Sequence, residues 1–221
     1  MSDWAIIFDV DGVLLQLTRA EEELFFAPFA KRIDAAQLSR DWNSYNIRND
    51  EEIVKEIVAR YHLAPREAEV ITAEYLALLE SGLAGALKSV PIAGARELLA
   101  AFAPHARLGI ATANFRKAAE LRLSHAGMWA PISGLAQGAD GGGHKADILA
   151  RAIAASGLPP ARVIYIGDNG NDVVAGQHNK AHFIGFSPDA ARRGKLEQAG
   201  AKRLAADHME TAGYIRAILF A

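Results

Sequence analysis

The segment that most constrains the fold lies near the start of the chain, where a short apolar run leads directly into two acidic residues. Residues 4–8, Trp-Ala-Ile-Ile-Phe, are apolar and β-prone, so they predict a buried parallel strand. Asp9 and Asp11 follow where this strand should end, and Gly12 lets the backbone turn. Open α/β sheets place their chemistry at the carboxyl ends of strands. Two carboxylates this close need a cation or a shared proton, although a simple aspartate turn closing the strand would also fit.

A second acidic segment favours a site over a simple turn. Residues 162–166, Arg-Val-Ile-Tyr-Ile, read as another buried strand, and Asp168 and Asp172 follow within Gly-Asp-Asn-Gly-Asn-Asp. Four carboxylates at two strand ends form an oxygen-rich site suited to Mg²⁺. A calcium loop would need acids or amides at alternate positions, a glycine at the sixth position and a distal glutamate, and neither segment has that pattern.

Composition limits the class of protein. The chain has 221 residues, of which 51% are hydrophobic, enough for one α/β domain with a small addition. The net charge of −2 favours neither a nucleic-acid partner nor an anionic membrane surface. The absence of cysteine excludes disulfides, thiolate zinc sites and a cysteine nucleophile. Because we find no signal peptide or membrane-spanning stretch, we expect a cytoplasmic protein.

The hydrophobic pattern divides the chain into two zones. Residues 16–85 show helical periodicity, with expected helices at 21–33, 51–61 and 66–79. Beyond them strands and helices alternate, which predicts a doubly wound parallel sheet of Rossmann-like α/β type. We therefore expect an α/β catalytic core from residues 1–15 and 86–221, and a helical cap domain, 16–85, inserted after the first strand. The cap would cover the acids, although an ordinary helical subdomain that completes a core would give the same pattern.

Two further motifs fall in the second zone. Thr112-Ala113-Asn114 ends the expected strand 107–112 and precedes a helix, so its hydroxyl, amide and free N–H groups can form a phosphate cradle. Plain helix capping explains the same residues equally well. Lys145 opens the expected helix 146–156, where the helix dipole disfavours a cation. A bound anion or the acidic cluster would remove that penalty. A weaker strand is expected at 132–136.

Taken in order, these motifs resemble those of the haloacid dehalogenase superfamily of phosphohydrolases, in particular members with a helical cap such as phosphoglycolate phosphatases. The resemblance covers nearly the whole chain. It implies that Asp9 is the nucleophile that forms an aspartyl-phosphate, and that Asp11 is the general acid and later the general base. It further implies Mg²⁺ held by the Asp9 side chain, the Asp11 carbonyl and Asp168, with Asp172 in support.

The same resemblance assigns the remaining motifs. Thr112-Ala113-Asn114 would bind the phosphate, through the Thr112 side chain and the Asn114 backbone, and Lys145 would neutralise charge and orient Asp9. Relatives often carry an aspartate shortly after the first motif, where this chain has Gln16 and Thr18, and a proline where it has Ala146. These departures concern the substrate rather than the chemistry.

Three functions remain open at this stage. The leading one is a Mg²⁺-dependent phosphatase of a small phosphorylated metabolite, such as phosphoglycolate or a sugar phosphate. A sugar-phosphate mutase would share all four motifs, whereas dehalogenation is disfavoured because dehalogenases of the family lack the acid at the Asp11 position. A non-catalytic phosphate-binding protein is the third, although clustered unpaired acids would serve no structural purpose.

Substrate choice should depend on the cap. The polar and aromatic stretch 41–49 lies between two expected helices, and we expect Arg48 or Arg19 to meet a second anionic group of the substrate. An exposed interhelical loop is the simpler interpretation. For the assembly, the sequence is compatible with a monomer or a homodimer.

Overall fold

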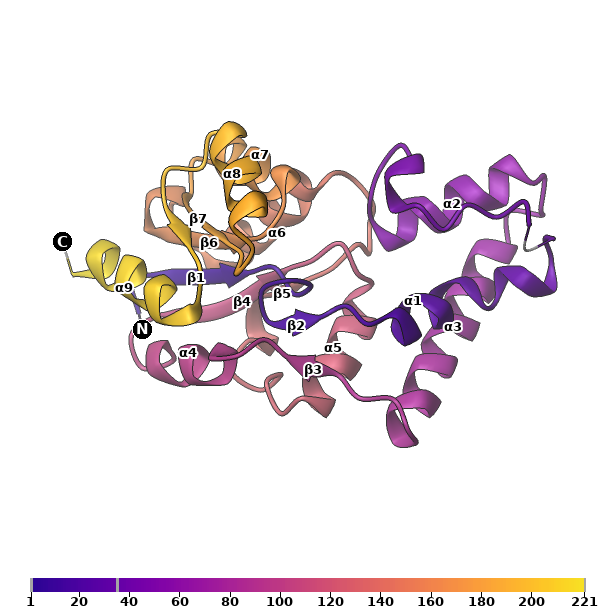
Figure 1. The fold of residues 1–221 in the computed structure, drawn as a ribbon, viewed down its shortest axis with the longest axis horizontal. Coiled ribbons are helices and arrows are strands. Elements are labelled where there is room, and N and C mark those ends of the chain that lie inside the picture. The colour runs from indigo at the N-terminus through magenta and orange to yellow at the C-terminus, as the bar shows by residue number, and fades with distance from the viewer. Residues whose placement is uncertain (1, 35, 221) are drawn as a thin grey trace.

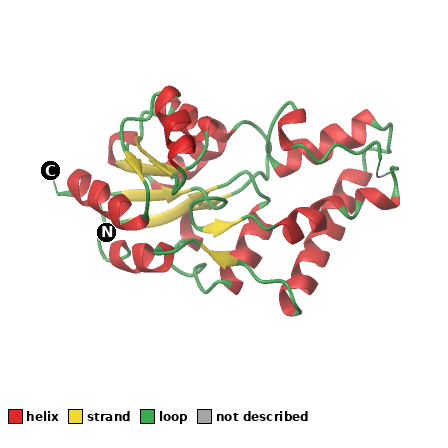
Figure 2. Cartoon of the chain, viewed as in Figure 1, coloured by secondary structure: helices red, strands yellow, loops and turns green. Residues whose placement is uncertain are grey.

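The computed structural model describes residues 2–34 and 36–220, and its centre is a parallel sheet (Figures 1 and 2). Within those residues the sheet has six strands in the order β5-β4-β1-β6-β7-β8, and every neighbouring pair is parallel. The strands are β1 (Ala5–Phe8), β4 (Arg107–Ala111), β5 (Ala136–Gln137), β6 (Val163–Gly167), β7 (His182–Phe186) and β8 (Leu204–Ala205). The expected Rossmann-like α/β sheet is thus confirmed.

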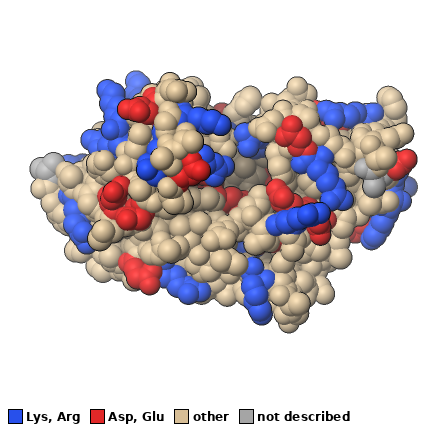
Figure 3. All heavy atoms as spheres, in the orientation of Figure 1, with Lys and Arg blue, Asp and Glu red and all other residues tan. Residues whose placement is uncertain are grey.

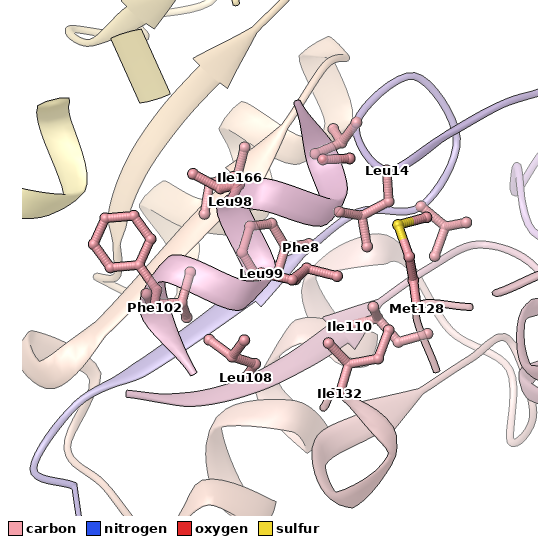
Figure 4. Close-up of a cluster of buried hydrophobic side chains, with 14 of the residues drawn as sticks. Phe8, Leu14, Leu98, Leu99, Phe102, Leu108, Ile110, Met128, Ile132 and Ile166 are labelled. Carbon is pink, nitrogen blue, oxygen red and sulfur yellow. The ribbon is translucent and has the colours of Figure 1, made fainter. Parts of the chain in front are cut away.

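Side chains of alternate strand residues point to opposite faces of the sheet, and each face is covered by helices. Ile6 and Phe8 of β1 pack against helices on one face, in a cluster that includes Leu98, Leu99 and Phe102 (Figure 4). The helices on this face are α4 (Ala95–Phe102), α5 (Arg116–His125) and α9 (His208–Leu219). The opposite face packs against α6 (Lys145–Ser156), α7 (Gly170–His178) and α8 (Ala190–Gln198). The sheet is buried on both faces, as parallel sheets generally are.

The helices between β1 and α4 form a separate layer beside the sheet (Figure 1). This layer, hereafter the helical insert, contains α1 (Arg19–Phe26), α2 (Asp50–Arg60) and α3 (Glu67–Ala84), with the 3₁₀ turns η1 (Phe29–Lys31) and η2 (Trp42–Ser44). It has its own hydrophobic cluster, in which the ring of Phe25 lies 5.1 Å from that of Trp42 and 5.2 Å from that of Tyr75. This cluster is separate from the two that cover the sheet, and it also includes Phe115 and Ala118 at the start of α5, on which the insert packs.

The two connections between the sheet and the helical insert run side by side. Leu15–Gln16 (β2) pairs antiparallel with Val90–Pro91 (β3), and Leu15 lies opposite Pro91. Neither β2 nor β3 can be recognised in the sequence, because two residues are too few to show a strand pattern. The pairing holds the segment that leads into the insert beside the segment that leads out of it.

Two expected elements differ in the structure. The strand expected at 132–136 is instead a 3₁₀ turn, η3 (Ser133–Leu135), followed by the two-residue β5. The helix expected at 21–33 ends at Phe26. Pro28 has no N–H to continue the α-helical hydrogen bonds, and the chain goes on as η1. No helix in the described part of the chain is long and apolar enough to cross a membrane.

Candidate active site

Three carboxylates meet where β1 and β6 end side by side. Because Phe8 pairs with Ile166 in parallel register, the residues after these strands reach the same edge of the sheet. One carboxylate oxygen from each of Asp9, Asp168 and Asp172 lies within 4.8 Å of the others. The structure thus brings together three of the acids that the sequence singled out.

Lys145 lies inside this acidic cluster. Its Nζ is 2.7 Å from Asp9 Oδ1 and 3.2 Å from Asp172 Oδ1, and both the lysine and Asp9 are buried. Burial alone would lower the pKa of Lys145, but the charges of Asp172 and Asp9 raise it above its ordinary value. The ammonium therefore stays charged at neutral pH, and the acids remove the penalty of placing a cation at the start of α6.

The two oxygens of Asp9 have different surroundings. Oδ1 accepts a hydrogen bond from the Val10 N–H at 2.8 Å and also faces Lys145, whereas no donor among the described residues engages Oδ2. Burial raises the pKa of Asp9 well above its usual range, and the nearby carboxylates add to this rise while Lys145 opposes it. One oxygen is thus fixed, and the other is left free to attack or to bind a cation.

Asp172 organises the loop after β6. It is fully buried, its Oδ2 accepts the N–H groups of Asp168 and Asn169 at 3.2 and 3.1 Å, and its Oδ1 accepts the Tyr165 hydroxyl at 2.5 Å. Burial and the charge of Asp172 raise the pKa of Asp168 to about 6, and the charge of Arg192 opposes this rise. Asp172 therefore holds the loop after β6 in place and raises the pKa of Asp168.

The cluster fits a hard divalent cation. Lys145 pairs with Asp9 and Asp172, and the more exposed Arg192 lies 3.3 Å from Asp168, so three carboxylates face two cations and negative charge is in excess. Carboxylate oxygens are the protein ligands that Mg²⁺ prefers. Gly12 keeps the site open: its φ is +78°, and a Cβ there would lie 2.2 Å from Asp168 Oδ2. Both the donor set and the available space agree with a metal site.

The loop after β4 forms a third side of the site. Thr112 is buried and its Oγ1 accepts the Asn114 N–H at 3.2 Å. Neighbouring backbone groups bind the helical insert: the Asp50 N–H donates to the Ala113 carbonyl at 2.9 Å, and the Phe115 N–H donates to Asp50 Oδ2 at 2.8 Å. The Thr112–Asn114 segment therefore faces the acids while its backbone is fastened to α2.

The first turn of α2 also contacts the loop before Lys145. The Asn49 side-chain amide donates to the Gly143 carbonyl at 2.6 Å, and the N–H groups of Gly141 and Gly142 donate to Glu51 Oε2 at 2.6 and 3.0 Å. These partners are about ninety residues apart in sequence, so the sequence analysis did not anticipate them. Together they hold the insert across the site.

Arg122 of α5 is a site residue that the sequence analysis missed. It is buried, and its guanidinium contacts Asp11 Oδ1 and Glu21 Oε1, each at 2.7 Å. Its spacing from Ala118 and Ala119 could have indicated burial, because all three residues lie on the buried face of α5. An arginine on an apolar helix face requires buried partners, which the sequence alone does not name.

A cavity of about 350 Å³ lies between the sheet edge and the helical insert, and Figure 3 shows a hollow between these two parts. Its floor includes Asp9 and Thr112, and Trp42 and Tyr75 contribute to its wall from the insert. Arg48 also lines it, as expected for a substrate contact, and no described residue forms an ion pair with it. Arg19 does not line the cavity: it is exposed and pairs with Glu23 at 3.0 Å.

Comparison with known proteins identifies the family of this chain. The family model of haloacid dehalogenase-like hydrolases matches residues 5–179, and the chain belongs to this family. A comparison with curated protein sequences gives no match.

Solved structures with the same fold cover almost the whole chain. A hydrolase from Pseudomonas syringae has 21% identity and a TM-score of 0.71, with 97% of this chain and 99% of that chain covered. A predicted phosphoglycolate phosphatase from Haemophilus somnus has 15% identity and a TM-score of 0.72, with 97% and 98% covered. CbbY from Rhodobacter sphaeroides, in complex with phosphate, has 24% identity and a TM-score of 0.67, with 94% and 95% covered.

The buried Asp50 predicts a pH-dependent change in stability. Burial raises its pKa from 3.8 to about 7, so unfolding releases a proton between these values and the folded state loses stability as pH rises through them. Asp50→Asn removes this loss and keeps an acceptor for Phe115. Relative to wild type, its free energy of unfolding should rise by about 2–4 kcal/mol from about pH 4 to pH 7, then stay level.

Urea unfolding at a series of pH values measures this difference, in which the contributions of the other acids cancel. Asp3→Asn, at an exposed acid, is the matched control and should show no such trend. A difference between Asp50→Asn and wild type that does not change with pH would contradict the prediction.

Proposed function

We propose that this hydrolase is a Mg²⁺-dependent phosphatase of a small phosphomonoester, and that it acts through an aspartyl-phosphate. The observation that carries the proposal is Asp9, a buried carboxylate at the floor of the cavity, with Oδ1 held by Lys145 and Oδ2 engaged by no donor among the described residues. A carboxylate is an established nucleophile in phosphoryl transfer. Membership of the haloacid dehalogenase-like hydrolases supports the same chemistry.

Each motif has a role in this reaction. Asp9 attacks phosphorus, while Lys145 orients the nucleophile and offsets negative charge. Asp11 donates a proton to the departing oxygen and later accepts one from the water that releases phosphate. Thr112 and the backbone of Asn114 bind phosphate oxygens at the end of β4. Phosphoryl transfer depends chiefly on such positioning and charge stabilisation.

Mg²⁺ would be held by the Asp9 side chain, the Asp11 carbonyl and Asp168, with Asp172 in support. When bound, the metal neutralises the repulsion between the carboxylates and an anionic phosphate. Burial, and after it the neighbouring carboxylates, raise the pKa values of Asp9 and Asp168, and such an ion would offset the cost of keeping these groups charged.

The helical insert would act as the cap of the site, so that residues 16–85 form the cap domain and residues 1–15 with 86–221 the catalytic core. Its contacts to the loops at Ala113 and Gly143 support this proposal, as does the wall that it gives the cavity. A cavity of about 350 Å³ suits a small metabolite. A mutase of the same fold would return the phosphoryl group to another oxygen of a sugar, and product analysis separates the two reactions.

The nucleophile assignment predicts the outcome of one substitution. Asp9→Asn keeps the shape of the side chain but removes the attacking oxygen, so phosphate release from a panel of small phosphomonoesters should fall by about 10³-fold or more. Release by wild type should need Mg²⁺ and stop with a chelator. Asp3→Asn should behave as wild type.

Phosphate release that survives Asp9→Asn would contradict the assignment. Phosphate moved between positions of a sugar phosphate, without release, would instead support the mutase.

Arg48 predicts a change in substrate preference. The exposed guanidinium lines the cavity and has no ion-pair partner among residues 2–34 and 36–220, so it can meet a second anionic group of the substrate. Arg48→Ala should lower kcat/KM for acidic esters about tenfold relative to neutral ones. Arg19→Ala is the matched control, because Arg19 lies outside the cavity and should leave the ranking unchanged. An unchanged ranking in Arg48→Ala would end this role.

A further inference from the structure

All three guanidinium nitrogens of Arg122 donate hydrogen bonds in the interior beside the site. Its side chain is 2% exposed, Nε donates to Glu21 Oε1 at 2.7 Å, and Nη1 donates to Asn114 Oδ1 at 3.0 Å. Nη2 donates to Asp11 Oδ1 at 2.7 Å and to the Gln16 carbonyl at 3.3 Å. Burying an arginine is unfavourable unless acids compensate it. Here two acids do so, and each belongs to a different part of the molecule.

One end of this network fixes Asp11. Its carboxylate is 24% exposed and lines the cavity, and Arg122 is the cation that holds its Oδ1. A carboxylate bonded through one oxygen to a planar guanidinium has a restricted rotamer, and its second oxygen remains available. Proton transfer requires that oxygen to stay within hydrogen-bond reach of the departing group. Arg122 therefore sets the position on which the role of Asp11 depends.

The other end belongs to the helical insert. Glu21 is buried in the first turn of α1, and its Oε2 accepts the N–H and the hydroxyl of Thr18 at 2.9 and 2.8 Å. This capping box fixes the Glu21 side chain to the start of the helix. A continuous set of charge-assisted hydrogen bonds thus joins α1, Arg122 and Asp11.

We infer that Arg122, anchored by Glu21, is a positioning residue for Asp11 in proton transfer to the leaving oxygen. It follows that this transfer requires α1 of the insert to be in place. The inference rests on the proposed function. The competing explanation is an ion-pair network that only fastens the insert to the sheet domain, and such a network would affect all substrates alike.

Leaving groups separate the two explanations. A nitrophenolate departs without a proton, whereas an alkoxide needs one, so only alkyl esters depend on a well-placed acid. The value kcat/KM includes only the steps up to departure of the leaving group, and it excludes the later hydrolysis of the phosphoenzyme. The change that a substitution causes in the ratio of kcat/KM for a primary alkyl phosphate and 4-nitrophenyl phosphate therefore reports on proton donation by Asp11.

The first variant is Arg122→Lys, which keeps the charge but cannot span Asp11, Glu21 and Asn114. We expect kcat/KM to fall about 100-fold for the alkyl phosphate and no more than about threefold for 4-nitrophenyl phosphate. Asp11→Asn should show the same selective loss. In the double variant, Arg122→Lys should add nothing to Asp11→Asn, because both act on one proton transfer.

Two further variants supply a control and an alternative test. Arg32→Lys alters a comparable arginine of the insert, which pairs with Glu67 and Glu74 at 2.6 and 3.1 Å away from the cavity. It should leave the ratio unchanged. If Arg122→Lys does not fold, Glu21→Gln tests the anchor instead, and it should cause a smaller selective loss for the alkyl ester.

Equal losses for both esters, or a double variant whose losses multiply, would overturn the inference and leave an ion-pair network that only fastens the insert. Wild type that cleaves neither ester nor any member of the phosphomonoester panel would overturn the proposed function itself, and the inference with it. The two failures are therefore distinguishable.

Discussion

Excess negative charge at a buried sheet edge determines how the surrounding loops and the helical insert are arranged. Asp9, Asp168 and Asp172 lie together, with Lys145 as the buried cation between them. Desolvation raises the pKa values of Asp9 and Asp168, so the cluster is costly in the free protein. Such a cluster is maintained only because the fold over-determines it: β1 and β6 pair directly, and Asp172 holds its own loop. A cation and an anionic ligand would relieve the excess charge.

The helical insert packs on α5 through apolar side chains, with the ring of Tyr75 6.4 Å from that of Phe115, and it is joined to the loops of the site by polar contacts. Asp50 binds the loop after β4, Asn49 and Glu51 bind the glycine loop before Lys145, and Glu21 binds Arg122. Polar contacts of this kind can be broken and remade at small cost in water, unlike a continuous hydrophobic core. Because they end on the loops that carry the candidate catalytic groups, the position of the insert and the geometry of the site are coupled.

The sequence predicts those parts of this arrangement that local patterns encode. The apolar runs of β1 and β6 and the acids that follow them identify the sheet and the acidic cluster, since a strand buried on both faces shows in its own residues. The edge strand β5 is shorter and later than predicted because residues 133–135 form a 3₁₀ turn, and α1 ends before Pro28. The roles of Asp50 and Arg122 depend on partners far away in sequence. A buried arginine on a helix face looks like a surface charge until its partners are known.

The proposed function requires that Asp9 carry the phosphoryl group during turnover. Rapid acid quench of the working enzyme, followed by peptide mapping by mass spectrometry, tests it most directly, since acid slows the hydrolysis of an acyl phosphate. The account predicts one phosphoryl group on the peptide that contains Asp9, present only with substrate and Mg²⁺ and absent from Asp9→Asn. A phosphoryl group on another residue, or phosphate released in single turnover with Asp9 unmodified at every quench time, would contradict it.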